Sequence, residues 1–228
     1  MTKRPLVIVG DSAIAEVAYE YFTHDSPYEV VAFAVESAHR KHDTLFGLPV
    51  VDFEGIEQRF PPERHEAFIA IGYMQLNRVR ARLVAASKAK GYALASYISS
   101  QAFVWRNAKI GEHCFILENN VIQAFVTIGD DVVLWSGNHI GHHSRIGNHV
   151  FVASHVVISG SVEIGDYCFL GVNVTVANNV TIGRDCLVGA GANVLKNAAP
   201  AGIYAVTHTE PKPISTVKYF GIGEEDPS

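Results

Sequence analysis

Histidines are the residues of this chain whose number and spacing most suggest chemistry. The 228-residue chain has 11 of them, and five lie between positions 139 and 155: His139, His142, His143, His149 and His155. A histidine with an ordinary pKa of about 6.5 can take a proton from an attacking group at neutral pH. Histidines are also common metal ligands, and others only line surfaces, so the elements that position these five decide between the roles.

The second half of the chain repeats every six residues. Aliphatic residues occupy 16 consecutive positions at this spacing, from Val104 to Val194, without an insertion, and glycine or alanine often follows. A hexapeptide period predicts a parallel β-helix. Three hexads form a triangular coil of 18 residues, in which each aliphatic residue points inward and stacks on the residue 18 positions away. A period of six is far from a multiple of 3.6, which excludes an α-helix. We expect about five coils over residues 98–202.

The same register assigns a place to the three cysteines. Cys114, Cys168 and Cys186 each lie two residues before a repeat position, where small apolar residues gather. We expect core residues there rather than nucleophiles or metal ligands. An odd and low cysteine count also does not suggest a disulfide framework. Asn120 and Asn138 occupy the same slot 18 residues apart, and we expect them to form a hydrogen-bonded ladder.

His142 falls at a different point of the repeat. It lies two positions after a repeat position, and the residues 18 before and 18 after it are Ala124 and Gly160. A large polar ring between small residues of the adjacent coils is expected to project into an open notch. This placement favours a functional role for His142 over a structural one, while His139 and His143 remain alternatives.

Residues 1–97 alternate between predicted strands and helices. Strands are expected at 6–9, 29–35, 68–71 and 92–98, with a helix capped by Ser12 and another over 76–86. This alternation predicts a small parallel α/β domain. The turn Gly10–Ala13 follows the first strand, where N–H groups at a helix start suit a phosphate. Residues 203–228 are predicted to be a C-terminal tail.

Composition narrows the classes of partner. The formal net charge of −5 argues against binding nucleic acid or an anionic membrane through bulk charge. No apolar run approaches the roughly 18 residues of a membrane-spanning helix. The first apolar run ends early at Asp11, so a signal peptide is not expected. A cytoplasmic protein is the default expectation.

Five segments resemble one known family: 9–17, 70–73, 139–147, 169–173 and 189–197. Together they resemble the bacterial sugar acetyltransferases of the sialic acid O-acetyltransferase type, over nearly the whole chain. The resemblance implies a Rossmann-like N-terminal domain (1–97) followed by a left-handed β-helix (98–202). It further implies a homotrimer with acetyl-CoA as cosubstrate and no metal. The expected reaction is acetyl transfer to a hydroxyl or amino group of a sugar or nucleotide sugar in bacterial surface-glycan biosynthesis.

The resemblance also assigns a catalytic position. His142 matches the histidine that acts as general base in the family, in a cleft between neighbouring subunits. Because a thioester is already activated, no covalent enzyme intermediate is needed. The family often places an acid directly after this histidine, whereas this chain has His143. Either an acid such as Glu118, Asp130 or Asp131 supplies the charge, or the base works unaided.

Binding positions follow from the same match. The residues that correspond to acetyl-CoA contacts are Phe151, Gly160, Val172 and Ala190, with Lys196 near the CoA phosphates. Those that correspond to contacts with a nucleotide-linked sugar are Gly10, Asp11, Ser12, Glu36, Gly72, Asn77 and Arg78. Asp11 would grip a ribose hydroxyl, because its charge would repel a phosphate. The alternative is that the N-terminal domain is structural or oligomerising.

Two other functions remain open. The γ-class carbonic anhydrases share the β-helix and bind zinc through interface histidines. His113 and His149, which are 36 residues apart, fit the first two ligand positions. Ser154 stands at the third position, and His155 is one residue away and would face differently. A non-catalytic trimeric scaffold is the other alternative.

Overall fold

The first part of the chain forms a parallel sheet. The computed structural model describes residues 3–207 and 210–221. The sheet contains β1 (Arg4–Val9), β2 (Tyr28–Val35), β3 (Thr44–Leu45), β4 (Leu48–Asp52), β5 (Glu66–Ile69) and β6 (Ala93–Leu94), in the order β3-β4-β2-β1-β5-β6. All neighbours are parallel except β3 and β4. Without β3, this is a doubly wound order, whose switch point lies between β1 and β5.

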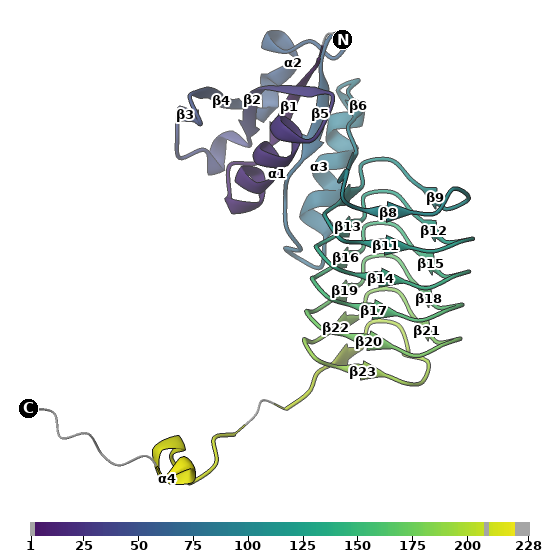
Figure 1. Ribbon diagram of the computed structural model, residues 1–228. Helices are drawn as coiled ribbons and strands as arrows, with labels where there is room; N and C mark the ends of the chain where they lie inside the picture. Colours follow the sequence, from purple (N-terminus) through teal and green to yellow (C-terminus); the bar gives the residue numbers. More distant parts are fainter. Residues whose placement is uncertain (1–2, 208–209, 222–228) are drawn as a thin grey trace, which may run out of the picture.

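Helices cover both faces of this sheet (Figure 1). α1 (Ala13–His24) buries Ala18 and Phe22 on one face, and α3 (Arg78–Ala89) buries Leu83 and Val84 on the other. The short helices η1 (Ser37–His39), η2 (Phe53–Gly55) and α2 (Ile56–Arg59) lie between β2 and β5 in the chain. Because both faces are covered, the central strands are apolar throughout.

The sequence pattern missed the short elements of this part. β3, β4 and α2 lack the long apolar runs on which the predictions depended. The strand predicted over 92–98 is two strands: β6 pairs with β5, whereas β7 (Tyr97–Ile98) pairs with the strand at Phe115–Ile116. The chain therefore leaves the first sheet and enters the next within three residues.

The rest of the chain is a parallel β-helix of three sheets, consistent with a left-handed coil. One sheet holds β7, β10 (Phe115–Ile116), β13 (Val133–Leu134), β16 (Phe151–Val152), β19 (Phe169–Leu170), β22 (Leu187–Val188) and β24 (Ile203–Tyr204). The second holds β8 (Phe103–Val104), β11 (Val121–Ile122), β14 (His139–Ile140), β17 (Val157–Ile158), β20 (Thr175–Val176) and β23 (Asn193–Val194). The third holds β9 (Lys109–Ile110), β12 (Thr127–Ile128), β15 (Arg145–Ile146), β18 (Glu163–Ile164) and β21 (Thr181–Ile182). Each strand pairs with strands 18 residues away, as the hexapeptide period predicts.

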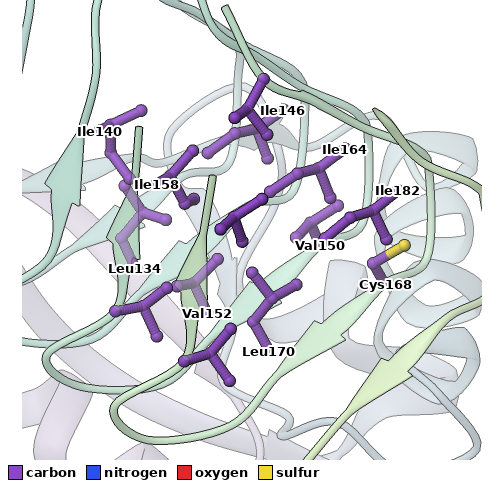
Figure 2. Close-up of a cluster of buried hydrophobic side chains, with 14 of the residues drawn as sticks. Leu134, Ile140, Ile146, Val150, Val152, Ile158, Ile164, Cys168, Leu170 and Ile182 are labelled. Carbon is purple, nitrogen blue, oxygen red and sulfur yellow. The ribbon is translucent and has the colours of Figure 1, made fainter. Parts of the chain in front are cut away.

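The repeat positions fill the interior of the coils. All of them from Ile116 to Val194 are buried, and Figure 2 shows Ile140 and Ile158 stacked above one another. Val104 and Ile110 are only partly buried, because the first coil has a neighbour on one side only. The three cysteines are fully buried, as predicted. Burial raises the pKa of the Cys114 and Cys168 thiols to about 12, so these sulfurs are unreactive.

Asn120 and Asn138 are both buried, but they do not form the direct ladder that the sequence suggested. Both donate instead to the carbonyl oxygen of Trp135. Asn138 Oδ1 also accepts from the N–H of Val156 at 2.8 Å. The side chains therefore bridge adjacent coils through the main chain, because its carbonyls turn inward at this corner.

The corners of the coils form three columns of two-residue turns. The His142 corner contains residues 106–107, 124–125, 142–143, 160–161, 178–179 and 196–197, between the second and third sheets. The Val172 corner contains 118–119, 136–137, 154–155, 172–173 and 190–191, between the first and second sheets. The Asp131 corner contains 112–113, 130–131, 148–149, 166–167 and 184–185, between the third and first sheets. The second residue of most turns has a positive φ, which is 61° at His143.

The two parts of the chain share one aromatic core. Phe22 of α1 lies 5.6 Å from Tyr97 and 6.3 Å from Phe115, measured between ring centroids, and Phe68 of β5 lies 5.1 Å from Phe115. The α/β part therefore sits on the first sheet of the β-helix (Figure 1). Beyond β24 the chain runs away from this body to α4 (Thr216–Phe220). None of the helices in the described ranges is both long and apolar enough to cross a membrane.

Candidate active site

His142 occupies an exposed turn between β14 and β15. Its backbone N–H donates to Oε1 of Gln123 at 2.9 Å, which ties the turn to the preceding coil. Its ring lies over Gly160 of the following coil, where a Cβ atom would come within 2.7 Å of Nε2. The sequence predicted an open notch at this point, and Gly160 creates it by having no side chain. Nε2 therefore faces outward at a place that another molecule can approach.

His143 contacts His142 directly. The two Nδ1 atoms lie 3.1 Å apart, and the rings meet edge to face at 84°. The His143 ring also stacks on Phe125, with centroids 4.6 Å apart and planes inclined by 23°. The pair at this corner is thus a histidine oriented by a second histidine.

The acids that could have supported His142 lie at other corners. Glu118 accepts from the Tyr21 hydroxyl at 2.6 Å, and Asp130 accepts from the backbone N–H of Glu112. Asp131 is buried at the Asp131 corner. Among the described residues, no carboxylate hydrogen-bonds either ring of the His142–His143 pair.

Asp131 is the centre of a buried network that joins α3 to the β-helix. Its carboxylate lies 2.8 Å from Nδ1 of both His113 and His149, and 2.8 Å from Nε of Arg80. Burial alone would raise the pKa of the Asp131 carboxyl. The Arg80 charge and the two histidine hydrogen bonds outweigh it and hold that pKa well below its ordinary value.

The network removes the basis of the γ-class carbonic anhydrase hypothesis. Nε2 of His113 accepts from the backbone N–H of Ile69 at 2.8 Å, and its Nδ1 donates to Asp131. Both ring nitrogens are therefore used inside the chain, and His113 has no lone pair to offer a metal. His139 is part of β14, and the His155 ring lies over Gly137 at the Val172 corner.

The positions predicted to contact acetyl-CoA fall on separate faces. Gly160 and Lys196 lie on the His142 corner, and Val172 and Ala190 lie on the Val172 corner. The second sheet separates these two corners within one chain. Val172 and Lys196 are exposed and accessible to a ligand.

Phe151 does not fit the prediction of a cofactor contact. Only 4% of its surface is exposed, because the Tyr73 ring packs on it with a centroid distance of 5.3 Å. It also stacks against Phe169 in the shared aromatic core. Its position on the first sheet places it under the α/β part of the chain.

Five of the predicted substrate positions line one cavity at the switch point of the first sheet. Its residues include Gly10, Asp11, Ser12, Glu36 and Gly72, and its volume is about 530 Å³. The carboxyl ends of β1 and β5 meet there, which is where ligands of doubly wound sheets bind. Gly10 has a φ of 128° and lies so close to Ala70 O that a Cβ would come within 2.7 Å of it.

The sequence did not identify the charged residues that complete this cavity. Arg82, His39 and Lys41 line it together with Met74. Arg82 donates from both terminal nitrogens to Glu36, each at 2.8 Å. The helical spacing of Arg78 and Arg82 marked them only as a basic face, and the fold was needed to show which of them points into the cavity.

Asn77 and Arg78 do not line the cavity, so the structure corrects their predicted role. Asn77 is fully buried, and its Nδ2 donates to the carbonyl oxygen of Cys168 at 3.1 Å. Arg78 pairs with Asp185 of the Asp131 corner. Both residues point away because Gln75, Leu76 and Asn77 all have a positive φ, which turns the chain toward the β-helix.

Comparisons with known proteins support this interpretation of the fold. The family model for bacterial transferase hexapeptide (six repeats) matches residues 107–142, 125–160 and 161–196, less than half of the chain. The structure of PerB from Caulobacter crescentus, in complex with CoA and GDP-perosamine, matches with a TM-score of 0.76 and 27% identity. That match covers 89% of this chain and 92% of PerB. The chain is an acyltransferase with hexapeptide repeats.

Two further structures resemble this acyltransferase in fold. The acetyltransferase domain of PglB from Neisseria gonorrhoeae FA1090 has a TM-score of 0.79 and 22% identity, covering 88% of this chain and 96% of the domain. WeeI from Acinetobacter baumannii AYE has a TM-score of 0.71 and 19% identity, covering 88% and 96%. No curated protein sequence matches the chain. The α/β part and the β-helix thus occur together in these proteins, as the resemblance predicted.

Proposed function

We propose that this acyltransferase moves an acetyl group from acetyl-CoA to an amino or hydroxyl group of a nucleotide-linked sugar. The observation that carries the proposal is His142, whose Nε2 faces outward over Gly160 on an exposed corner. The C. crescentus relative, solved with CoA and GDP-perosamine, supports both substrate classes. A sugar acetyltransferase of this kind would act in the cytoplasm, in bacterial surface-glycan biosynthesis, where both substrates are made.

In the proposed reaction, the lone pair of the sugar amine or hydroxyl attacks the thioester carbon. Nε2 of His142 accepts the proton of the attacking group as the new N–C or O–C bond forms. The C–S bond then breaks, and the proton passes from Nε2 to the leaving CoA thiolate. His142 returns to its neutral form, so no other reactant is required.

The cavity at Gly10 is the proposed site of the nucleotide. It follows a glycine turn at the start of α1 and is lined by Lys41 and Arg82, which suits the diphosphate of a Rossmann-like site. Its lining residues do not include His142. The base therefore has to reach the sugar from another part of the assembly, which supports a homotrimer with sites between subunits.

A thiol-release assay with acetyl-CoA tests the proposal. Wild-type protein is expected to release CoA in the presence of a nucleotide-linked amino sugar and to release much less with His142→Ala. Removing a general base typically lowers kcat by about 10²–10⁴-fold, with kcat/KM falling in parallel. If a panel of nucleotide-linked sugars gives no release, the non-catalytic scaffold becomes the better interpretation. If His142→Ala retains full activity, another residue is the base.

A further inference from the structure

The residue after the proposed base is a histidine, and its ring is held in place by three contacts. Its backbone N–H donates to the carbonyl oxygen of Ala124 at 3.1 Å. Its ring stacks on Phe125, which occupies the same turn position one coil earlier with a φ of 63°. Its Nδ1 lies 3.1 Å from Nδ1 of His142. Phe125 and Ala124 therefore fix the ring that His142 meets.

A contact between two Nδ1 atoms requires one of them to donate and the other to accept. If His143 donated, Nδ1 of neutral His142 would be the acceptor and its proton would sit on Nε2, leaving no lone pair there. If His142 donates, its Nε2 carries the free lone pair at the open notch over Gly160. Only the second arrangement leaves the outward-facing nitrogen able to act as a base.

We propose that His143 is a positioning residue that accepts a hydrogen bond from Nδ1–H of His142 and so keeps Nε2 of His142 unprotonated. The inference rests on the proposed function for its catalytic consequence, but the tautomer of His142 is a property of the free protein. When His142 takes the proton of the attacking group, its Nδ1–H remains bonded to the neutral ring of His143. Orientation is thus supplied without a negative charge.

The surroundings of the pair leave this role to His143. The charged residues closest in the fold are Arg106, two coils earlier in the same corner, and Arg145, at the start of β15. Glu163 and Lys109 lie in the same column of the third sheet as Arg145. Among the described residues, the only side chain that hydrogen-bonds the His142 ring is His143.

Two substitutions separate hydrogen bonding from packing. His143→Phe keeps a ring that can stack on Phe125, as Phe125 itself shows that this turn accepts phenylalanine, but it has no acceptor nitrogen. His143→Asn loses the stacking and keeps an acceptor oxygen, and asparagine tolerates the positive φ. We expect His143→Phe to lower kcat roughly 10–100-fold with an unchanged KM for acetyl-CoA, and His143→Asn to keep most of the activity.

Nitrogen NMR of histidine-labelled protein gives a readout that does not need a substrate. The His142 resonances, identified by their loss in His142→Ala, are expected to show the proton on Nδ1 in the wild type. In His143→Phe the proton is expected to move to Nε2. A wild-type His142 protonated on Nε2 overturns the proposal, as does a His143→Phe variant with wild-type kcat or equal losses in both variants. Failure of the wild type to release CoA would instead count against the proposed function.

Discussion

At the scale of single residues, the cavity at the first sheet contains one unsatisfied acid. Oδ2 of Asp11 is buried and has no hydrogen-bond partner among the described residues. Buried polar atoms are nearly always paired, so an orphan atom in a cavity wall points to a donor on a ligand. A ribose hydroxyl of the nucleotide is the donor that fits a carboxylate next to a glycine turn.

Replacing Asp11 by alanine is therefore expected to weaken binding of the nucleotide-linked sugar. A hydrogen bond to a charged group contributes about 1.5–3 kcal/mol, so Kd should rise about 10–100-fold. Calorimetric titration of the nucleotide diphosphate measures this, and the KM for acetyl-CoA should stay constant as the internal control. An unchanged Kd would place the nucleotide outside this cavity.

Gly160 is the second residue whose role the structure redefines. The sequence suggested that a larger residue would block acetyl-CoA and raise its KM. Because a Cβ would lie 2.6 Å from Cε1 of His142, Gly160→Ala must first displace the base. We expect kcat to fall more than 10-fold, the size of effect that small misplacements of catalytic groups produce. Steady-state kinetics that show a raised KM with an unchanged kcat would contradict this.

At the scale of elements, α3 is fixed to the β-helix by a buried ion pair. Arg80 and Asp131 are each 1% exposed and 2.8 Å apart, and His113 and His149 complete the donors around the carboxylate. Such a network positions the α/β part over the first sheet. Removing one partner leaves a buried charge without compensation, which typically costs about 3–5 kcal/mol.

Asp131→Asn is expected to lower the free energy of unfolding by about that amount, measured by chemical denaturation. Asp43→Asn is the matched control, because the Asp43 side chain is 91% exposed in its pair with Arg40 and should leave stability unchanged. If Asp131→Asn unfolds at the same denaturant concentration as the control, the network does not anchor α3.

The same carboxyl predicts how stability depends on pH. Its pKa is lowered in the folded chain, so Asp131 contributes stability that is fully present above its unfolded pKa of about 3.9. That contribution is lost as pH falls below this value toward the folded pKa. Melting curves of the wild type should therefore shift to lower temperature below about pH 4, and Asp131→Asn should lose this part of the slope.

At the scale of the whole molecule, the predicted cofactor positions lie at two corners. Gly160 and Lys196 share the corner of His142, whereas Val172 and Ala190 lie across the second sheet. One acetyl-CoA that contacts both groups needs two chains, each contributing a different corner. A closed ring of three copies would build three such sites from the same two surfaces.

Complementation between two inactive variants tests this arrangement. His142→Ala removes the base from one corner, and Ala190→Trp fills the other. Neither variant alone should be active, but subunits mixed before assembly should recover up to about a quarter of the wild-type activity, because each site needs one intact corner from each neighbour. Light scattering should give the mass of a trimer. Mixed subunits without activity, or an active monomer, would exclude sites between subunits.

The sequence alone determined the β-helix, its register and its core. A period of six admits one fold, and burial follows directly from it, so the register by itself places the cysteines in the core and the notch at His142. The sequence also located the glycine turn and Asp11, since both follow a recognisable strand.

The tertiary structure decided the contacts between segments far apart in the chain. Tyr73 covers Phe151, the run of positive φ before α3 turns Asn77 away from the cavity, and Arg82 rather than Arg78 reaches Glu36. The Nδ1 contact of His142 and His143 depends on side-chain rotamers set by Phe125 in the preceding coil. A local pattern does not encode these contacts, because each arises only when the α/β part and successive coils pack against one another.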